Sequence, residues 1–439
     1  MIAPNSLSGK ILSHLDRPVA VWGFGCSGIG AAGLLAARGV EAVVYDAEVP
    51  DADRNRFGPT EAGEHDLVVY SPGFAPNHPW FAAASAAGCE CLGEIDFASL
   101  FWEGPIIAVT GTNGKTTLTE LLTCALGSAG IPAVATGNIG ACFSRMASCI
   151  RNIDTYAVCE VSSFQAESLR LLSPNWTLWT NFAEDHLERH GSMRAYFEAK
   201  RMLVSRTPSG HSLYGPGVLA YGDAHGHVLD PAGLADLLPE SYHTGVEGTP
   251  FATDPQRENL VLAVALWRRL GLDDTALQES LQSFRIGDHR LRKIATVAGV
   301  EYWNDSKATN FHACESALAR FERPVVWIGG GKSKGGDLER FADRLSPRVR
   351  QAVLLGETGP TMSRLLTERG ISTRIVANLD DAVRTAMAMA MPGDRVVLSP
   401  AFSSLDMYGG YDDRGQAFAE AVRVLSAKPI STRTPLWAP

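Results

Sequence analysis

The chain has 439 residues, of which 45% are hydrophobic and 20% charged, and its formal net charge is −9. This composition is typical of a folded globular protein of about two to four domains and excludes a disordered or fibrous chain. The charges are spread along the sequence without long runs of one sign, so we expect no nucleic-acid or membrane partner, and small anions must bind at local sites.

The eight cysteines are scattered between positions 26 and 314 without Cys-x-x-Cys clusters. This pattern favours free thiols in a reducing cytoplasm over a disulfide scaffold or a zinc site. The N-terminal segment lacks the basic and apolar regions of a signal peptide, and no stretch reaches the ~18 apolar residues of a membrane span. We therefore expect a cytoplasmic protein without a targeting segment.

Residues 19–48 predict a strand, a glycine-rich turn, a helix and a second strand that ends at Asp46. The turn carries Gly23, Gly25 and Gly28, and this spacing with a later acidic residue fits the dinucleotide fingerprint. Glycines let the backbone approach a pyrophosphate, which any nucleotide diphosphate supplies. The interpretations are a nicotinamide site, another nucleotide site, or a tight turn without a ligand.

A further strand ends in Ser71-Pro-Gly73, at the edge where open α/β sheets bind ligands, and a boundary follows near 92–95. The next strand, 106–109, leads into the loop 111-GTNGKTT-117 at the mouth of a helix. Val109 occupies the position where the usual nucleotide-triphosphate loop has its first glycine. The shortened loop still offers backbone N–H groups and Lys115 to phosphates and Thr116 to magnesium. An ordinary turn with a surface lysine is the alternative.

Acidic and imidazole side chains follow two neighbouring apolar strands of this second segment. Glu160 ends the strand near 156–161, and Asp185 with His186 follows the strand near 176–180. Such groups at adjacent strand ends predict hard oxygen ligands for magnesium. Helices are expected at 256–269 and 273–284. A third α/β segment then opens near 299, with strands near 324–328, 352–355, 373–376 and 395–399.

In combination, several of these motifs resemble those of the Mur ligases, from about residue 19 to 425. They are 110-TGTNGKTT-117, 160-EVSSFQ-165, 181-NFAEDHLERH-190, 288-DHR-290, 304-NDSKATN-310 and 398-LSPAFSSLD-406. The resemblance implies an α/β protein of three domains, each with a largely parallel sheet flanked by helices. The first, 1–93, is Rossmann-like and binds the UDP-substrate. The second, 94–286, is P-loop-type and binds ATP. The third, 287–439, is Rossmann-like, binds the amino acid and closes on ATP.

The resemblance also implies the activity, an ATP-dependent amide ligase of peptidoglycan precursor synthesis. The spacing is most similar to the branch of the family that adds D-glutamate to UDP-N-acetylmuramoyl-L-alanine and releases ADP and phosphate. In that reaction the γ-phosphate of ATP converts a carboxylate into an acyl phosphate, and an amine attacks it through a tetrahedral intermediate. The partners are these small molecules, two magnesium ions assist, and the protein is expected to be a monomer.

Site residues are carried over position by position from the family. The catalytic residues are Lys115, Glu160, His186 and Lys200. Magnesium is held by Thr116 and Glu160 at one site and by His186 and carbamylated Lys200 at the other. ATP is contacted by Gly111, Thr112, Asn113, Gly114, Lys115, Thr116, Thr117, Asn259, Arg290 and Asp305. The UDP-substrate is contacted by Gly25, Cys26, Ser27, Asp46, Ser71, Gly73 and Asn138. The amino acid is contacted by Lys307, Thr309, Lys334, Ser404 and Tyr411.

Some choices stay open at this point. Lys332 is an alternative to Lys334, and a solvated lysine on a helix face is the alternative for Lys200. The family's His-Asn-x-x-Asn motif is reduced to 255-PQREN-259, the segment before it is short, Tyr411 stands where a Phe is usual, and Ala47-Glu48 lacks a basic residue. Competing functions are a Mur ligase that uses another amino acid or L-glutamate, a nicotinamide-dependent oxidoreductase, and an ATP-binding regulator.

Overall fold

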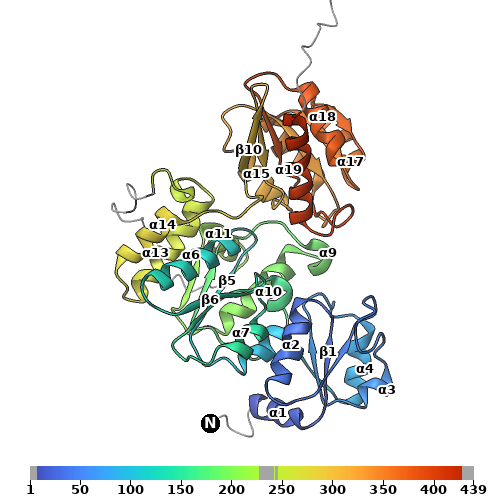
Figure 1. Cartoon of the computed structure of the whole chain (residues 1–439), viewed down its shortest axis with the longest axis vertical. Coiled ribbons are helices and arrows are strands. Elements are labelled where there is room, and N and C mark those ends of the chain that lie inside the picture. The colour runs from blue at the N-terminus through green and yellow to red at the C-terminus, as the bar shows by residue number, and fades with distance from the viewer. Residues whose placement is uncertain (1–6, 227–241, 243–245, 428–439) are drawn as a thin grey trace, which may run out of the picture. The chain divides into compact units, whose positions relative to one another are not determined.

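Three β-sheets organise the chain in the computed structural model, which describes residues 7–226, 242 and 246–427 (Figure 1). The chain divides into two compact units: Met1–Phe182 with Ser192–Phe284, and Ala183–Gly191 with Arg285–Pro439. In the described part of the chain, no helix is both long and apolar enough to cross a membrane.

The first sheet has four parallel strands in the order β2-β1-β3-β4. They are β1 (Val19–Trp22), β2 (Ala42–Tyr45), β3 (Leu67–Tyr70) and β4 (Glu90–Gly93). Successive residues of β1 face opposite sides, so Val21 packs in one hydrophobic cluster with Leu34, and Trp22 in another with Trp80. Both faces are thus covered, as a parallel sheet requires. The helices are α1 (Leu7–Ser13), η1 (His14–Asp16), α2 (Cys26–Ala36), α3 (Pro59–Ala62), α4 (Pro79–Ala87) and α5 (Glu94–Ser99).

The second sheet has five parallel strands in the order β6-β7-β5-β8-β9, which places β5 between β7 and β8. They are β5 (Ile106–Thr110), β6 (Ala133–Gly137), β7 (Tyr156–Glu160), β8 (Trp176–Trp179) and β9 (Ser212–Tyr214). The helices of this unit are α6 (Lys115–Ser128), α7 (Phe143–Cys149), α8 (Ser163–Ala166), α10 (Met193–Ser205), α11 (Pro216–Ala224), η2 (Pro250–Ala252), α13 (Gln256–Arg269) and α14 (Asp274–Ser283).

The first and second sheets share one hydrophobic cluster. It joins Val19 and Leu34 of the first sheet layer to Ala108 and Phe143 of the second. The buried carboxylate of Asp96, on α5, accepts hydrogen bonds from the backbone N–H groups of residues 170, 171 and 172 over 2.6, 3.1 and 2.8 Å. These hydrogen bonds lie within the predicted second domain, whereas the shared cluster includes residues before and after position 93. The predicted boundary at 93 thus crosses a continuous core, and the three-domain division stays a prediction.

The third sheet has six strands in the order β10-β11-β15-β12-β13-β14, of which only β10 runs antiparallel. They are β10 (Arg292–Val297), β11 (Val300–Asn304), β12 (Val325–Gly330), β13 (Val349–Leu355), β14 (Ser372–Ile375) and β15 (Arg395–Leu398). The helices of this unit are α9 (Leu187–His190), α15 (Phe311–Leu318), α16 (Leu338–Leu345), η3 (Ser346–Arg348), α17 (Gly359–Glu368), α18 (Leu379–Met389) and α19 (Tyr411–Ala427).

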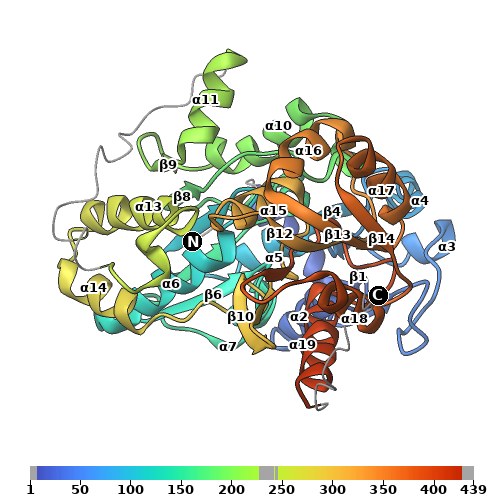
Figure 2. The same ribbon diagram turned by 90° about the horizontal axis from the view of Figure 1, so that it is seen from above.

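Helices cover both faces of this third sheet. Trp327 of β12 packs with Phe341 of α16, whereas its neighbour Ile328 packs in the other cluster with Val383 of α18. Figure 2 shows α16 and α17 on one side of β12–β14, and α18 and α19 on the other. The carboxyl ends of β11, β15 and β12 are adjacent, so the loops that follow them are brought together.

Candidate functional site

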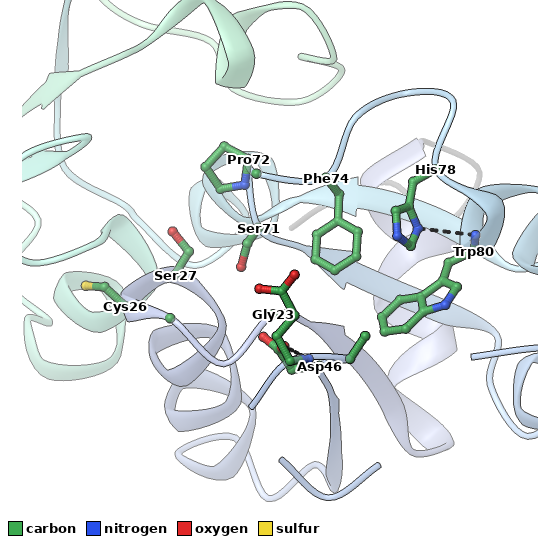
Figure 3. A pocket seen from close by; sticks show the side chains of 13 residues that line it. Gly23, Cys26, Ser27, Asp46, Ser71, Pro72, Phe74, His78 and Trp80 are labelled. Carbon is green, nitrogen blue, oxygen red and sulfur yellow. Dashed lines mark hydrogen bonds between the residues drawn. The ribbon is translucent and has the colours of Figure 1, made fainter. Parts of the chain in front are cut away.

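A pocket of about 500 Å³ lies at the carboxyl edge of the first sheet. It is lined by Gly23, Gly25, Cys26, Ser27, Asp46, Ala47, Glu48, Ser71, Pro72, Gly73, Phe74, His78 and Trp80. Figure 3 shows Cys26 and Ser27 at one end of the pocket, Phe74, His78 and Trp80 at the other end, and Ser71 between them. These loops follow β1, β2 and β3, so the pocket lies where the strand order reverses, the usual place for a ligand in such a sheet.

The pocket holds an ordered carboxylate and a buried hydroxyl. The Asp46 carboxylate accepts from the N–H groups of Phe24 at 2.8 Å and Glu48 at 2.9 Å, which orders both loops. Burial alone would raise the pKa of Asp46, but these backbone donors outweigh it and the pKa lies below its ordinary value. The Ser71 hydroxyl oxygen is buried without a hydrogen-bond partner among the described residues, so it is available to a ligand.

The glycine loop 111–117, called the phosphate loop below, joins β5 to α6 beside the second sheet. The Lys115 ammonium donates to the carbonyl oxygens of Gly111 at 2.9 Å and Thr112 at 3.0 Å. The strand end after β8 also holds the loop, because the Asn181 side chain accepts from the N–H of Asn113 at 2.8 Å. The loop is thus held by Lys115, at the start of α6, and by Asn181, which follows β8.

A hydroxyl and a carboxylate meet beside this loop. The Thr116 hydroxyl donates to Glu160 Oε2 at 2.8 Å, and Glu160 Oε1 accepts from the side-chain amide of Asn138 at 3.0 Å. The three residues follow or end the adjacent strands β5, β7 and β6, which explains why they converge. A hydroxyl and a buried carboxylate are hard oxygen ligands of the kind that Mg²⁺ prefers. Among the described residues, no three His, Cys, Asp or Glu side chains form a metal-binding group.

Lys200, on α10, is buried under the same loop. Only 1% of the residue is exposed, and its ammonium donates to the Gly111 carbonyl at 2.9 Å. It also lies 4.9 Å from the centre of the Tyr196 ring, one helical turn earlier. The interpretation of Lys200 as a solvated helix-face lysine is therefore wrong.

Asn259 completes the surroundings of the loop in this unit. The residue is buried, and its side-chain amide donates to Gln256 at 2.9 Å and approaches the Gly114 carbonyl at 3.5 Å. The one asparagine retained from the expected motif thus contacts the phosphate loop directly.

In the C-terminal unit, Lys334 forms an ion pair with Asp185. The Lys334 ammonium lies 3.1 Å from Asp185 Oδ1 and 3.4 Å from the Thr309 hydroxyl, and Asp185 Oδ2 accepts from Asn310 at 3.0 Å. Burial would raise the pKa of Asp185, but the Lys334 charge leads the effects that hold it below its ordinary value. The cavity here is only about 10 Å³, so it has no room for an amino acid in this conformation. Lys332 is exposed, and its backbone pairs with Ser403.

Other predicted residues lie in the loops after β11 and β15. The Lys307 ammonium lies 3.6 Å from the centre of the Tyr411 ring. Ser404 is buried, and its carbonyl accepts from the N–H of Tyr408 at 2.8 Å. The Asp305 carboxylate is buried and accepts from the Ser399 hydroxyl at 2.7 Å. Burial raises the pKa of Asp305 to about 7, while Ser399 and the half-buried Arg290 act in the opposite direction.

Comparison with known proteins gives a family. The Mur ligase middle domain matches residues 109–223, and the Mur ligase glutamate ligase domain matches residues 289–402. The UDP-N-acetylmuramoylalanine–D-glutamate ligase of Synechocystis sp. is 31% identical, over 91% of this chain and 97% of the relative. The enzyme of that name from Frankia casuarinae is 35% identical, over 94% and 95%. The chain belongs to the Mur ligase family.

Solved structures share the fold of this Mur ligase at low sequence identity. The UDP-N-acetylmuramate-alanine ligase MurC of Thermotoga maritima has a TM-score of 0.57 at 16% identity, covering 93% of this chain and 100% of that one. The MurF ligase of Thermotoga maritima, in complex with ADP, has a TM-score of 0.55 at 16% identity, covering 82% and 96%. At this identity the likeness concerns the fold.

The predicted residues fall into groups within each unit. Six of the seven residues expected at the UDP-substrate line the pocket of the first sheet, whereas Asn138 lies beside Glu160. His186 belongs to the C-terminal unit, where its ring lies 3.3 Å from Glu188, and its role at a metal stays a prediction.

Sequence reasoning missed two features of the sites. Phe74, His78 and Trp80 form an aromatic wall of the pocket, and their only signal is the run of rings after Ser71-Pro-Gly73. Arg414 is buried and donates to the Ser306 hydroxyl at 3.0 Å and to the Phe402 carbonyl at 3.1 Å, which ties together the loops that carry Lys307 and Ser404. Burial lowers the pKa of Arg414 to about 10.

Proposed function

We propose that this Mur ligase joins D-glutamate to UDP-N-acetylmuramoyl-L-alanine and converts ATP to ADP and phosphate. The observation that carries the proposal is that one compact unit contains both the glycine loop at 111–117, where Thr116 is hydrogen-bonded to Glu160, and the pocket of the first sheet. We assign each of them to a phosphorylated ligand. The relatives named for this reaction match almost the whole chain, which supports the choice of substrates.

The pocket of the first sheet is the proposed site of the UDP group. The loop at Gly23–Gly25 and the unpartnered Ser71 hydroxyl face the pyrophosphate, and the aromatic wall at Phe74 and Trp80 offers the uracil a stacking surface. The carboxylate oxygens of Asp46 accept hydrogen bonds from a ribose hydroxyl or a base N–H group. Asn138, beside Glu160, lies where the rest of the substrate approaches the phosphate loop.

The phosphate loop is the proposed site of ATP, with Asn259 beside it and Arg290 and Asp305 contributed by the C-terminal segment. Lys115 exchanges its backbone partners for phosphate oxygens and balances charge on the transferring phosphoryl group. Thr116 and Glu160 fit a magnesium ion, and His186 and carbamylated Lys200 are assigned to a second. A magnesium ion held by these residues would neutralise phosphate charge during the transfer.

The proposed reaction is the one that the family resemblance implies. The substrate carboxylate takes the γ-phosphoryl group, which turns one of its oxygens into a good leaving group. The amine of D-glutamate attacks the carbonyl carbon, the tetrahedral intermediate expels phosphate, and the amine loses a proton. Lys334, Thr309, Lys307, Ser404 and Tyr411 are assigned to the two carboxylates of the glutamate.

A coupled phosphate-release assay tests the proposal. We expect release with UDP-N-acetylmuramoyl-L-alanine, ATP and D-glutamate, and little with L-glutamate or other amino acids. Lys115→Ala should abolish release while UDP still binds, whereas the matched Lys293→Ala, at an exposed ion pair with Glu301, should keep activity. Thermal stabilisation by NADH and none by UDP would favour the oxidoreductase instead. ATP binding without phosphate release, whichever amino acid is supplied as acceptor, would favour an ATP-binding regulator.

A further inference from the structure

Two cysteines approach each other beside the pocket of the first sheet, although one belongs to a helix of the first sheet and the other to a loop of the second. Cys26 is the first residue of α2, and Cys142 precedes α7. The Cys142 thiol donates to the Cys26 carbonyl at 3.1 Å, and the Cys26 sulfur lies 3.9 Å from the Gly140 carbonyl. Each sulfur therefore reaches the backbone of the segment that carries the other.

The packing of α2 against α7 explains this approach. Gly30 lies one turn after Cys26 on the same face of α2, and a Cβ at Gly30 would come within 2.1 Å of the Cys142 sulfur. Only a residue without a side chain leaves room for the Cys142 thiol at this face. Figure 3 shows the Cys26 sulfur turned away from Ser71 and Phe74, and so away from the interior of the pocket.

The two thiols differ in exposure. Cys26 is exposed, whereas Cys142 is 2% exposed. Burial, followed by the nearby Glu94 carboxylate, raises the pKa of Cys142 to about 12, and the Cys26 thiol adds to this effect. Cys26 is thus the residue of the pair that solvent reaches, and Cys142 is its buried neighbour.

We propose that Cys26 and Cys142 are a site of reversible oxidation, at which a hydroperoxide closes a disulfide between α2 and the loop before α7. The Cys26 sulfur attacks the peroxide oxygen and becomes a sulfenic acid, with release of water or an alcohol. The Cys142 sulfur then attacks the Cys26 sulfur, the S–O bond breaks, and its hydroxyl leaves with the Cys142 proton as water. One peroxide is reduced and two thiols are oxidised to one disulfide.

The disulfide acts on two parts of the substrate site. Cys26 lines the pocket beside Gly25 and Ser27, and the loop that ends at Cys142 begins at Asn138, which holds Glu160. The disulfide removes the Cys142 thiol proton and with it the hydrogen bond from Cys142 to the Cys26 carbonyl, so we expect the first turn of α2 to adjust. The loss of about one charge-assisted hydrogen bond to a phosphate weakens UDP binding by roughly tenfold. This consequence rests on the proposed UDP site, whereas the disulfide itself does not.

The experiment treats the whole chain with hydrogen peroxide and compares wild type with Cys142→Ser and Cys124→Ser. We expect wild type and Cys124→Ser, which lacks an exposed cysteine of α6, to lose about 2 Da per chain by the balance above and to give a peptide that links residues 26 and 142. UDP affinity should then fall, and a thiol reductant should restore it. Cys142→Ser should bind UDP normally and keep that affinity after peroxide.

Two results would overturn the oxidation site: a link between other cysteines in place of Cys26–Cys142, and sulfinic or sulfonic acid at Cys26 without a link. A Cys26–Cys142 link that leaves UDP affinity unchanged would overturn the effect on substrate binding. If the reduced wild type fails to bind UDP at all, the proposed function fails at its first site. The linked peptide still reports separately on the thiol pair.

Discussion

Lys115 and Lys200 donate hydrogen bonds to the same oxygen, the carbonyl of Gly111, each over 2.9 Å. Two ammonium groups on one acceptor repel each other, and Lys200 is almost fully buried, so water screens the repulsion poorly. Conversion of Lys200 to a carbamate, which the family resemblance implies, would replace one cation by an anion that can bind magnesium.

We therefore expect Lys200→Ala to lose most of the ligase activity and to regain part of it when acetate is added to fill the vacant position. The measurement is phosphate release with and without acetate, with chloride at equal ionic strength as the control. Activity of the unrescued variant equal to wild type would contradict a role for Lys200. Rescue by chloride alone would point to a general salt effect.

The choice between Lys332 and Lys334 can be tested with a matched pair. Lys334 contacts Asp185 and Thr309, whereas Lys332 is exposed. Lys334→Met should raise the KM for D-glutamate by about tenfold or more, because a charge-assisted hydrogen bond to a carboxylate is lost. Lys332→Met should leave the KM nearly unchanged. Similar KM values for both variants would remove Lys334 from the amino-acid site.

Gly114 gives a test of the phosphate loop. Its φ is +82°, and a Cβ there would lie 2.7 Å from the Asn259 side chain. Gly114→Ala should cost about 1–3 kcal/mol in stability and weaken ADP binding. The control is Gly127→Ala, in the last turn of α6, where φ is not positive and a Cβ meets nothing within 4 Å. That change should stabilise the protein by up to about 1 kcal/mol. Thermal unfolding and ADP titration distinguish the two, and equal shifts would contradict the loop geometry.

Asp305 predicts a pH dependence of stability. Its pKa is raised to about 7 in the folded state, so the folded protein retains a proton that the unfolded chain has already released. The contribution is complete below the unfolded value of about 4 and is lost as pH rises through about 7. Asp305→Asn should therefore lose less stability than wild type between pH 5 and 8. Melting temperatures across this range measure the difference, and parallel curves would refute the burial argument.

The convergence of Thr116 and Glu160 could be predicted, because residues at the carboxyl ends of neighbouring parallel strands share one edge of the sheet. The hairpin of β10 and β11 could not be predicted from the sequence. Its two-residue turn, Ala298-Gly299, has φ of +50° and +77° without the Asn-Gly or Asp-Gly signal that usually marks such turns, and β10 is largely exposed.

The burial of Lys200 has a signal in the sequence that the prediction did not use. Tyr196, Phe197 and Leu203 lie four and three positions before it and three after it, so helical spacing puts Lys200 on the apolar face of α10. The sequence does not show which groups it meets, because its hydrogen-bond partner Gly111 lies 89 positions away. The aromatic wall at Phe74 and Trp80 could not be predicted. Aromatic residues in a short segment give the same sequence pattern whether their rings fill a core or line a pocket.

The core that runs from β1 through α5 to β5 bears on how members of this family exchange parts. Leu34 and Phe143 belong to one hydrophobic cluster, although they lie on opposite sides of residue 93. A chimera that takes residues 1–93 from one relative and the remainder from another would cut through matched surfaces, and mismatched side chains would leave cavities or overlaps. Inheritance of the first sheet together with the second, as one piece, keeps those surfaces intact.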